Sequence, residues 1–133
     1  MAYRIVNMAE DPRSGQFAYF RGMTFPFAGL TVEMDITDMM TARGSRPFFL
    51  SLLYAVVRAA NAVPELRRRL LDGQVVEFDR CYPSYTAMKD SGVYVYCLVD
   101  SGLLPYETFL TDGKRRQAEA LRGDELVESG DPL

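Results

Sequence analysis

The sequence predicts an α/β fold of the two-layer α+β type, in which helices pack against a mixed, largely antiparallel sheet. Residues 46–63 are apolar on nearly every side, which is typical of a helix buried among neighbours. The pair Asp72-Gly73 separates two β-competent runs and is a strong signal for a tight hairpin. Residues 84–89 and 93–99 alternate on either side of a short turn, which indicates a second hairpin.

The remaining elements follow from local patterns. Apolar and polar residues alternate over Leu30–Ile36, so we expect a half-buried strand there. Both faces of 93–99 are apolar or aromatic, which predicts a central strand covered on both sides. Other expected elements are a short strand at 3–6 and helices over 13–22, 37–43 and about 105–122. Pro64 should end the apolar helix.

Composition narrows the class of protein. With 133 residues, the chain has the length of one domain, which we assign to residues 1–133. The net charge of -3 argues against nucleic acid as a partner, because phosphate binding needs a clustered positive surface. Arg58 interrupts the apolar run, and a membrane span needs about 20 mostly apolar residues, so no membrane partner is expected.

The two cysteines, Cys81 and Cys97, fit no metal-binding spacing. The first residues carry acids where a cleavable signal would carry an apolar run. We therefore expect free thiols, a cytoplasmic location and no metal.

The chain contains no histidine. A Ser-His or Cys-His nucleophile pair and a histidine-ligated metal site are therefore excluded within these 133 residues. Any proton transfer by this chain alone would have to use Asp, Glu, Lys, Tyr or Cys.

A set of short motifs follows in a fixed order along the chain. They are Asp11-Pro12-Arg13, the aromatics Phe17, Tyr19 and Phe20, the run Leu30–Thr37, Pro47-Phe48-Phe49, Asn61, Glu65-Leu66-Arg67 and Tyr82–Thr86. In order and spacing, from about Pro12 to Cys97, this set resembles the N-terminal half of chloramphenicol acetyltransferase. The sequence thus resembles that family through the ordered set rather than through any single motif.

The resemblance implies an O-acetyltransferase that moves an acetyl group from acetyl-coenzyme A to a hydroxyl acceptor, chloramphenicol or a similar small molecule. It also implies a homotrimer with the acceptor pocket at the subunit interface. The family's catalytic motif, His-His-x-x-x-Asp-Gly, is absent from this chain, so the chain would supply pocket wall and no catalytic residue. The alternative is a non-catalytic short relative that acts as a ligand-binding or assembly module.

The resemblance also implies the residues of the acceptor pocket. They are the aromatic pair Tyr19 and Phe20, Thr24 on the following loop, Ser84 and Thr86 on one strand, and Val95 and Cys97 on the next. Each has a plainer interpretation: the aromatic pair could pack onto the core, the hydroxyls could be ordinary strand residues, and Cys97 could be a small buried side chain.

Two further expectations concern arginine residues. In the family, the counterpart of Arg13 pairs with the aspartate of the missing motif, so in this chain Arg13 should be a solvated surface residue. The run Arg67-Arg68-Arg69 could bind the phosphates of coenzyme A, but a charge run at a helix end is more typical of a solvated face.

Overall fold

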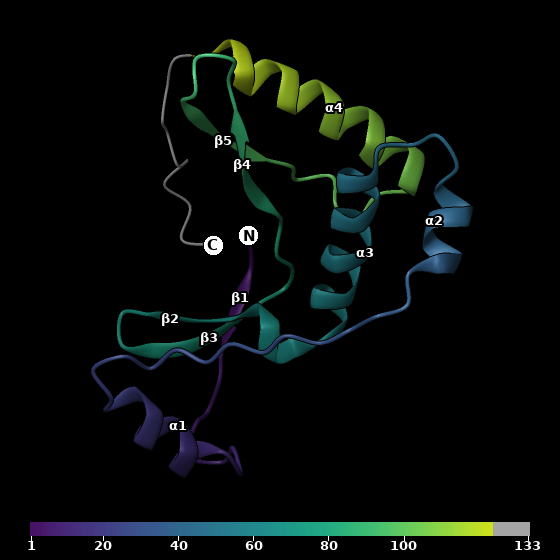
Figure 1. The fold of residues 1–133 in the computed structure, drawn as a ribbon. Helices are drawn as coiled ribbons and strands as arrows, with labels where there is room; N and C mark the ends of the chain where they lie inside the picture. Colours follow the sequence, from purple (N-terminus) through teal and green to yellow (C-terminus); the bar gives the residue numbers. More distant parts are fainter. Residues whose placement is uncertain (124–133) are drawn as a thin grey trace.

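The computed structural model describes residues 1–123, which form an α+β fold (Figure 1). The elements in order are β1 (Tyr3–Ile5), α1 (Ser14–Arg21), α2 (Thr37–Arg43), α3 (Phe48–Ala62), the 3-10 helix η1 (Pro64–Arg67), β2 (Arg68–Leu71), β3 (Gln74–Phe78), β4 (Ser84–Met88), β5 (Tyr94–Leu98) and α4 (Tyr106–Arg122). The four predicted helices and both predicted hairpins are therefore confirmed.

The strands form two antiparallel sheets, one of three strands in the order β1-β3-β2 and one formed by β4 and β5. The turn between β2 and β3 has positive φ at both central residues, 48° at Asp72 and 80° at Gly73. This is the type I′ geometry that matches the twist of two-residue hairpins and that an Asp-Gly pair favours.

The main core lies between α3, α4 and the β4–β5 sheet. Its buried members are Leu50, Cys97, Val99, Phe109 and Leu110. Gly113 of α4 is buried, and a Cβ at this position would stand 3.2 Å from Cδ2 of Leu50. Gly113 lowers the intrinsic stability of α4, but its lack of a side chain allows α3 and α4 to approach each other closely.

The predicted strand over Leu30–Ile36 is wrong. The segment has no regular secondary structure, and no strand among residues 1–123 pairs with it. Three of its four apolar members are exposed, at 90% for Leu30, 63% for Val32 and 76% for Met34, and Ile36 is half-buried. Alternation alone does not make a strand, because the backbone groups of a strand need a neighbouring strand to bond.

Helix α3 is less enclosed than its sequence predicts. Only Leu50, Ser51 and Val57 are buried, whereas Phe49 and Val56 are 48% and 54% exposed. The described residues thus cover one side of this apolar helix and leave the other side open.

The prediction of a central strand over residues 93–99 is also wrong. Within the described part of the chain, β5 pairs with β4 alone. Val95 and Cys97 on one of its faces are buried, while Tyr94 on the other is 45% exposed. Strand β5 is therefore fully covered on one face and only partly covered on the other, where Tyr96 and Leu98 are half-buried.

None of the helices within residues 1–123 combines the length and hydrophobicity that crossing a bilayer requires.

Candidate functional site

The β4–β5 hairpin carries four of the predicted pocket residues on two opposite faces. The register pairs Thr86 with Tyr96 on one face and Tyr85 with Cys97 on the other. Because side chains alternate along a strand, Ser84 lies on the same face as Thr86, and both are exposed. We call the side chains on this side the hydroxyl face: Ser84, Thr86, Met88, Tyr94, Tyr96 and Leu98.

The opposite face of the hairpin belongs to the core. Val95 and Cys97 are each 2% exposed, and Cys97 packs in the cluster that contains Leu50 and Phe109. The structure therefore places these two side chains beneath the hairpin, away from Ser84 and Thr86. The interpretation of Cys97 as a small buried side chain is confirmed.

Tyr85 closes the buried side. Its hydroxyl donates to Oε1 of Gln117 at 3.3 Å, and its ring packs against Phe49 with the centroids 4.8 Å apart. Burial, together with the neighbouring Cys97 thiol, raises the pKa of Tyr85 well above its usual value. Tyr85 thus remains a neutral hydrogen-bond donor and holds the hairpin against α4.

A cavity of about 440 Å³ lies along β4, between α3 and α4. Of the predicted pocket residues, Thr86 lines it, next to polar side chains from Lys114 and Gln117. The walls are mostly apolar and aromatic, with Phe49 and Tyr85 among them. A mostly apolar cavity with a few polar groups is the usual form of a small-molecule site.

The aromatic pair on α1 faces outward. Tyr19 is 68% exposed and Phe20 54% exposed, and their rings meet edge to face with the centroids 5.4 Å apart. The interpretation that both pack onto the core is therefore wrong. Thr24 is also exposed, in the irregular segment after α1.

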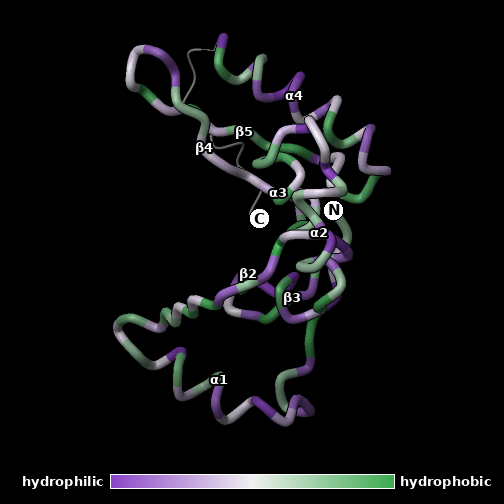
Figure 2. The backbone as a smooth tube through the Cα atoms, turned by 45° about the vertical axis from the view of Figure 1, so that its right-hand side comes forward, coloured by the Kyte–Doolittle hydropathy of each residue, from purple (hydrophilic) through white to green (hydrophobic). Residues whose placement is uncertain are grey.

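The structure does not bring the two groups of predicted residues together. Helix α1 lies beside the β1-β3-β2 sheet, whereas the β4–β5 hairpin lies at the other end of the molecule (Figures 1 and 2). Within one chain, Tyr19, Phe20 and Thr24 therefore do not share a pocket with Ser84 and Thr86.

Arg13 lies at the surface as predicted, with its side chain 54% exposed, but it is paired with carboxylates of this chain. Its Nη2 donates to Oε1 of Glu65 at 2.9 Å, and its backbone N–H and Nε donate to Oδ1 of Asp11 at 2.9 and 3.3 Å. The backbone N–H and the guanidinium of Arg13, with Arg68 behind them, lower the pKa of the Asp11 carboxyl below its usual value. Asp11 and Glu65 thus supply carboxylates where the family resemblance implied an absent partner.

The arginine run is also more buried than predicted. The side chains of Arg67 and Arg68 are only 15% and 20% exposed, and both approach Glu77 of β3, at 3.7 and 3.3 Å. Arg68 also pairs with Asp11 at 3.1 Å. These two guanidinium groups are therefore committed to carboxylates and do not fit a role in binding coenzyme A phosphates.

Sequence reasoning missed this ion-pair network. It joins three carboxylates, Asp11, Glu65 and Glu77, to four arginines: Arg4 of β1, Arg13 just before α1, Arg67 of η1 and Arg68 of β2. The signal in the sequence was the arginine run 67–69, which stands between the acidic residues Glu65 and Glu77. No group of His, Cys, Asp and Glu within residues 1–123 is arranged to hold a metal ion.

The sequence model of the chloramphenicol acetyltransferase family matches residues 1–111. A chloramphenicol acetyltransferase from a Klebsiella species is 27% identical over 90 residues, which are 66% of this chain and 41% of that protein. Chloramphenicol acetyltransferase 2 from Escherichia coli is 32% identical over 76 residues, 56% of this chain and 36% of that protein.

A solved chloramphenicol acetyltransferase structure superimposes with a TM-score of 0.77 at 28% identity. The match covers 98% of this chain and 60% of that one, and the match to the Klebsiella protein covers 41% of its length, so this chain spans less than two thirds of these relatives. The family match over residues 1–111 and the shared α+β fold show that the chain belongs to the chloramphenicol acetyltransferase family.

Proposed function

We propose that the chain is the acceptor-binding part of an O-acetyltransferase that moves an acetyl group from acetyl-coenzyme A to the hydroxyl of a small molecule, chloramphenicol or a similar acceptor. The observation that carries the proposal is the family match over residues 1–111. The hydroxyl face supports it, because Ser84, Thr86 and Tyr96 offer groups that can both donate and accept hydrogen bonds.

In the proposed function the general base lies outside this chain, because the chain has no counterpart of the histidine that the family resemblance implies as the base. A base must take the proton of the acceptor hydroxyl as that oxygen attacks the thioester carbonyl. Cys97 is a poor substitute, because it is buried in the core. The proposed role of the chain is thus to bind and orient the acceptor.

The proposed assembly is a homotrimer whose acceptor pocket is completed by a second subunit. The separation between α1, which carries Phe20, and the β4–β5 hairpin, which carries Thr86, supports this (Figure 1). The free thiols Cys81 and Cys97 are compatible with the proposed cytoplasmic location. We assign no residue of this chain to acetyl-coenzyme A.

A second function has its own support. The absence of histidine and a network of ion pairs satisfied within the chain are what we expect of a non-catalytic ligand-binding or assembly module. Binding of a hydrophobic dye separates the two candidates. Strong binding by the 133-residue chain indicates apolar surface that further strands would cover, whereas a chain that binds no dye favours the independent module.

The acceptor role is tested with Phe20→Ala in the protein purified from its own complete gene. We expect KM for chloramphenicol to rise several-fold while kcat changes little, because an exposed aromatic wall contributes mainly to binding. Phe27→Ala is the matched control, since Phe27 is 86% exposed and lies outside the predicted site. An unchanged KM for Phe20→Ala removes this residue from the pocket.

A further inference from the structure

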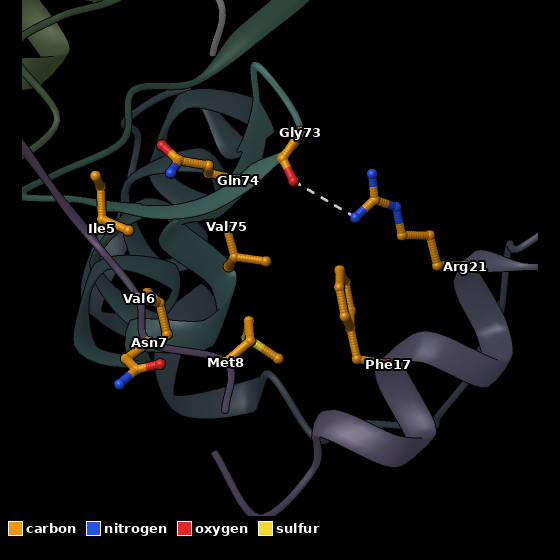
Figure 3. Close-up of a pocket in the computed structure, with 9 residues that line it drawn as sticks. All are labelled: Ile5, Val6, Asn7, Met8, Phe17, Arg21, Gly73, Gln74 and Val75. Carbon is orange, nitrogen blue, oxygen red and sulfur yellow. Dashed lines mark hydrogen bonds between the residues drawn. The ribbon is translucent and has the colours of Figure 1, made fainter. Parts of the chain in front are cut away.

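A second cavity of about 440 Å³ lies at the opposite end of the molecule from the hydroxyl face, between α1, the end of β1 and the β2–β3 turn (Figure 3). Its apolar lining comes from Ile5, Val6, Met8, Phe17 and Val75. The charged group among its lining residues is Arg21, and no acidic side chain lines it. The proposed acetyl transfer makes no use of this cavity.

Helix α1 directs two side chains into the cavity. Phe17 and Arg21 are four residues apart and therefore lie on one face of the helix. Figure 3 shows both side chains pointing toward the β2–β3 turn, with the guanidinium carbon of Arg21 6.0 Å from the centroid of the Phe17 ring. Neither Tyr19 nor Phe20 is among the residues that line the cavity, so the cavity is distinct from the exposed aromatic pair.

The guanidinium of Arg21 has spare hydrogen-bonding capacity. Its hydrogen bond to the carbonyl of Gly73 is long, at 3.5 Å, and no carboxylate among residues 1–123 forms an ion pair with it. Arg13 and Arg68, by contrast, meet carboxylates at 2.9 and 3.1 Å. Since a guanidinium has five N–H donors, a ligand carboxylate could replace the weak carbonyl contact with a two-pronged ion pair.

The turn that carries Gly73 gives the cavity a fixed rim. Both central residues of the β2–β3 turn have positive φ, a backbone geometry with few alternatives. Val75 is anchored in β3 opposite Leu70 and is 9% exposed. The apolar wall and the carbonyl rim are therefore formed before any ligand arrives, which reduces the entropic cost of binding.

We infer that this cavity binds a small amphipathic monocarboxylate, with its carboxylate on Arg21 and its apolar body against Met8, Phe17 and Val75. The fork of an arginine matches the two oxygens of a carboxylate. One cation above apolar walls fits a single negative charge better than a phosphate dianion, whose second charge would be left unpaired. The volume of about 440 Å³ is within the range of small-molecule sites.

The probe for this site is octanoate, titrated calorimetrically into the 133-residue chain. We expect saturable binding, a loss of about ten-fold or more in affinity for Arg21→Gln, and a smaller loss for Arg21→Lys, which keeps the charge but not the fork. Arg122→Gln is the matched control, because Arg122 lies at the end of α4 and bonds only the carbonyl of Ala118 in the described chain. Its affinity for octanoate should equal that of the unmodified protein.

NMR locates the probe. Octanoate should change the chemical shifts of the Gly73 amide and the Met8 methyl group. Octylammonium, which has the opposite charge, should change neither. The inference is overturned by absence of octanoate binding at millimolar concentration, by equal affinity in Arg21→Gln, or by shifts confined to the β4–β5 hairpin. The experiment needs no acetyl-coenzyme A, so its result is independent of the proposed acetyl transfer.

Discussion

Glu77 is the centre of the ion-pair network, and its replacement by glutamine is the sharpest test of how this part of the fold is stabilised. The residue is 7% exposed on the middle strand β3. Its Oε2 accepts hydrogen bonds from Nη2 of Arg4 at 3.0 Å and Nε of Arg68 at 3.3 Å, and its Oε1 lies 3.7 Å from Nη2 of Arg67. Glu77→Gln keeps the shape of the side chain and removes its charge.

The expected loss in the free energy of unfolding depends on how exposed the three arginine partners of Glu77 are. The side chain of Arg4 is 68% exposed, and such a pair contributes at most about 1 kcal/mol. Arg67 and Arg68 are 15% and 20% exposed, so their charges cannot be fully solvated after the substitution. Breaking a buried pair costs about 3–5 kcal/mol, and the partial exposure here reduces the expected loss to about 2–4 kcal/mol in the free energy of unfolding.

The same carboxylate predicts a dependence on pH. Burial alone would raise the pKa of Glu77, but the hydrogen bonds from Arg4 and Arg68 prevail and hold it below its ordinary value of 4.5. Because the folded pKa is depressed, the contribution to stability is complete above the unfolded value and is lost as the pH falls through the folded pKa. The difference between Glu77→Gln and the unmodified protein should therefore shrink below about pH 4.5.

Urea unfolding followed by circular dichroism measures both effects. Glu119→Gln is the control, because Glu119 has a side chain 52% exposed and pairs with Arg115 on the surface of α4. We expect this control to change stability by less than about 0.5 kcal/mol. A Glu77→Gln variant as stable as the control at pH 7 would refute the assigned role of the network.

Two further predictions concern the scaffold under the hydroxyl face. Gly102→Ala should destabilise the fold by about 1–3 kcal/mol, because a Cβ at this position would lie 2.6 Å from Cγ1 of Val57. Gly29→Ala is its control in the same urea titration: no atom lies within 4 Å of a Cβ there, so this substitution should leave the stability unchanged. Asn61→Ala should lower the free energy of unfolding by about 1–3 kcal/mol, because the backbone N–H and the carbonyl of Cys81 both lose their hydrogen-bond partner. Faster hydrogen exchange of the Cys81 amide would show that these two bonds are the cause.

Local sequence patterns predicted the structure correctly where a residue's conformation depends on its neighbours in sequence. The Asp72-Gly73 turn forms as predicted, because its positive φ values depend on those two residues. The boundaries of α3 follow from Pro47 before it and Pro64 after it. The family resemblance also rested on short motifs and was confirmed.

Local sequence patterns gave wrong predictions where a strand or a charged side chain depends on a partner that is distant in sequence, or that is absent from the described residues. Leu30–Ile36 alternates like a strand but finds no strand to pair with among residues 1–123. Arg68 was assigned to a solvated run because its partners, Asp11 and Glu77, lie 57 and 9 positions away. The division of the predicted pocket residues between two ends of the molecule depends on tertiary structure, which no local motif reports.

The most direct test of the proposed function is chloramphenicol-dependent release of the coenzyme A thiol from acetyl-coenzyme A by the protein purified from its own complete gene. We predict release by a polypeptide heavier than the 15.0 kDa of this chain, and none by the 133-residue chain alone, which has no histidine to act as base. Release by the 133-residue chain would contradict the assignment of the base to a segment outside it. Absence of release from the folded product of the complete gene would contradict the acetyltransferase proposal itself.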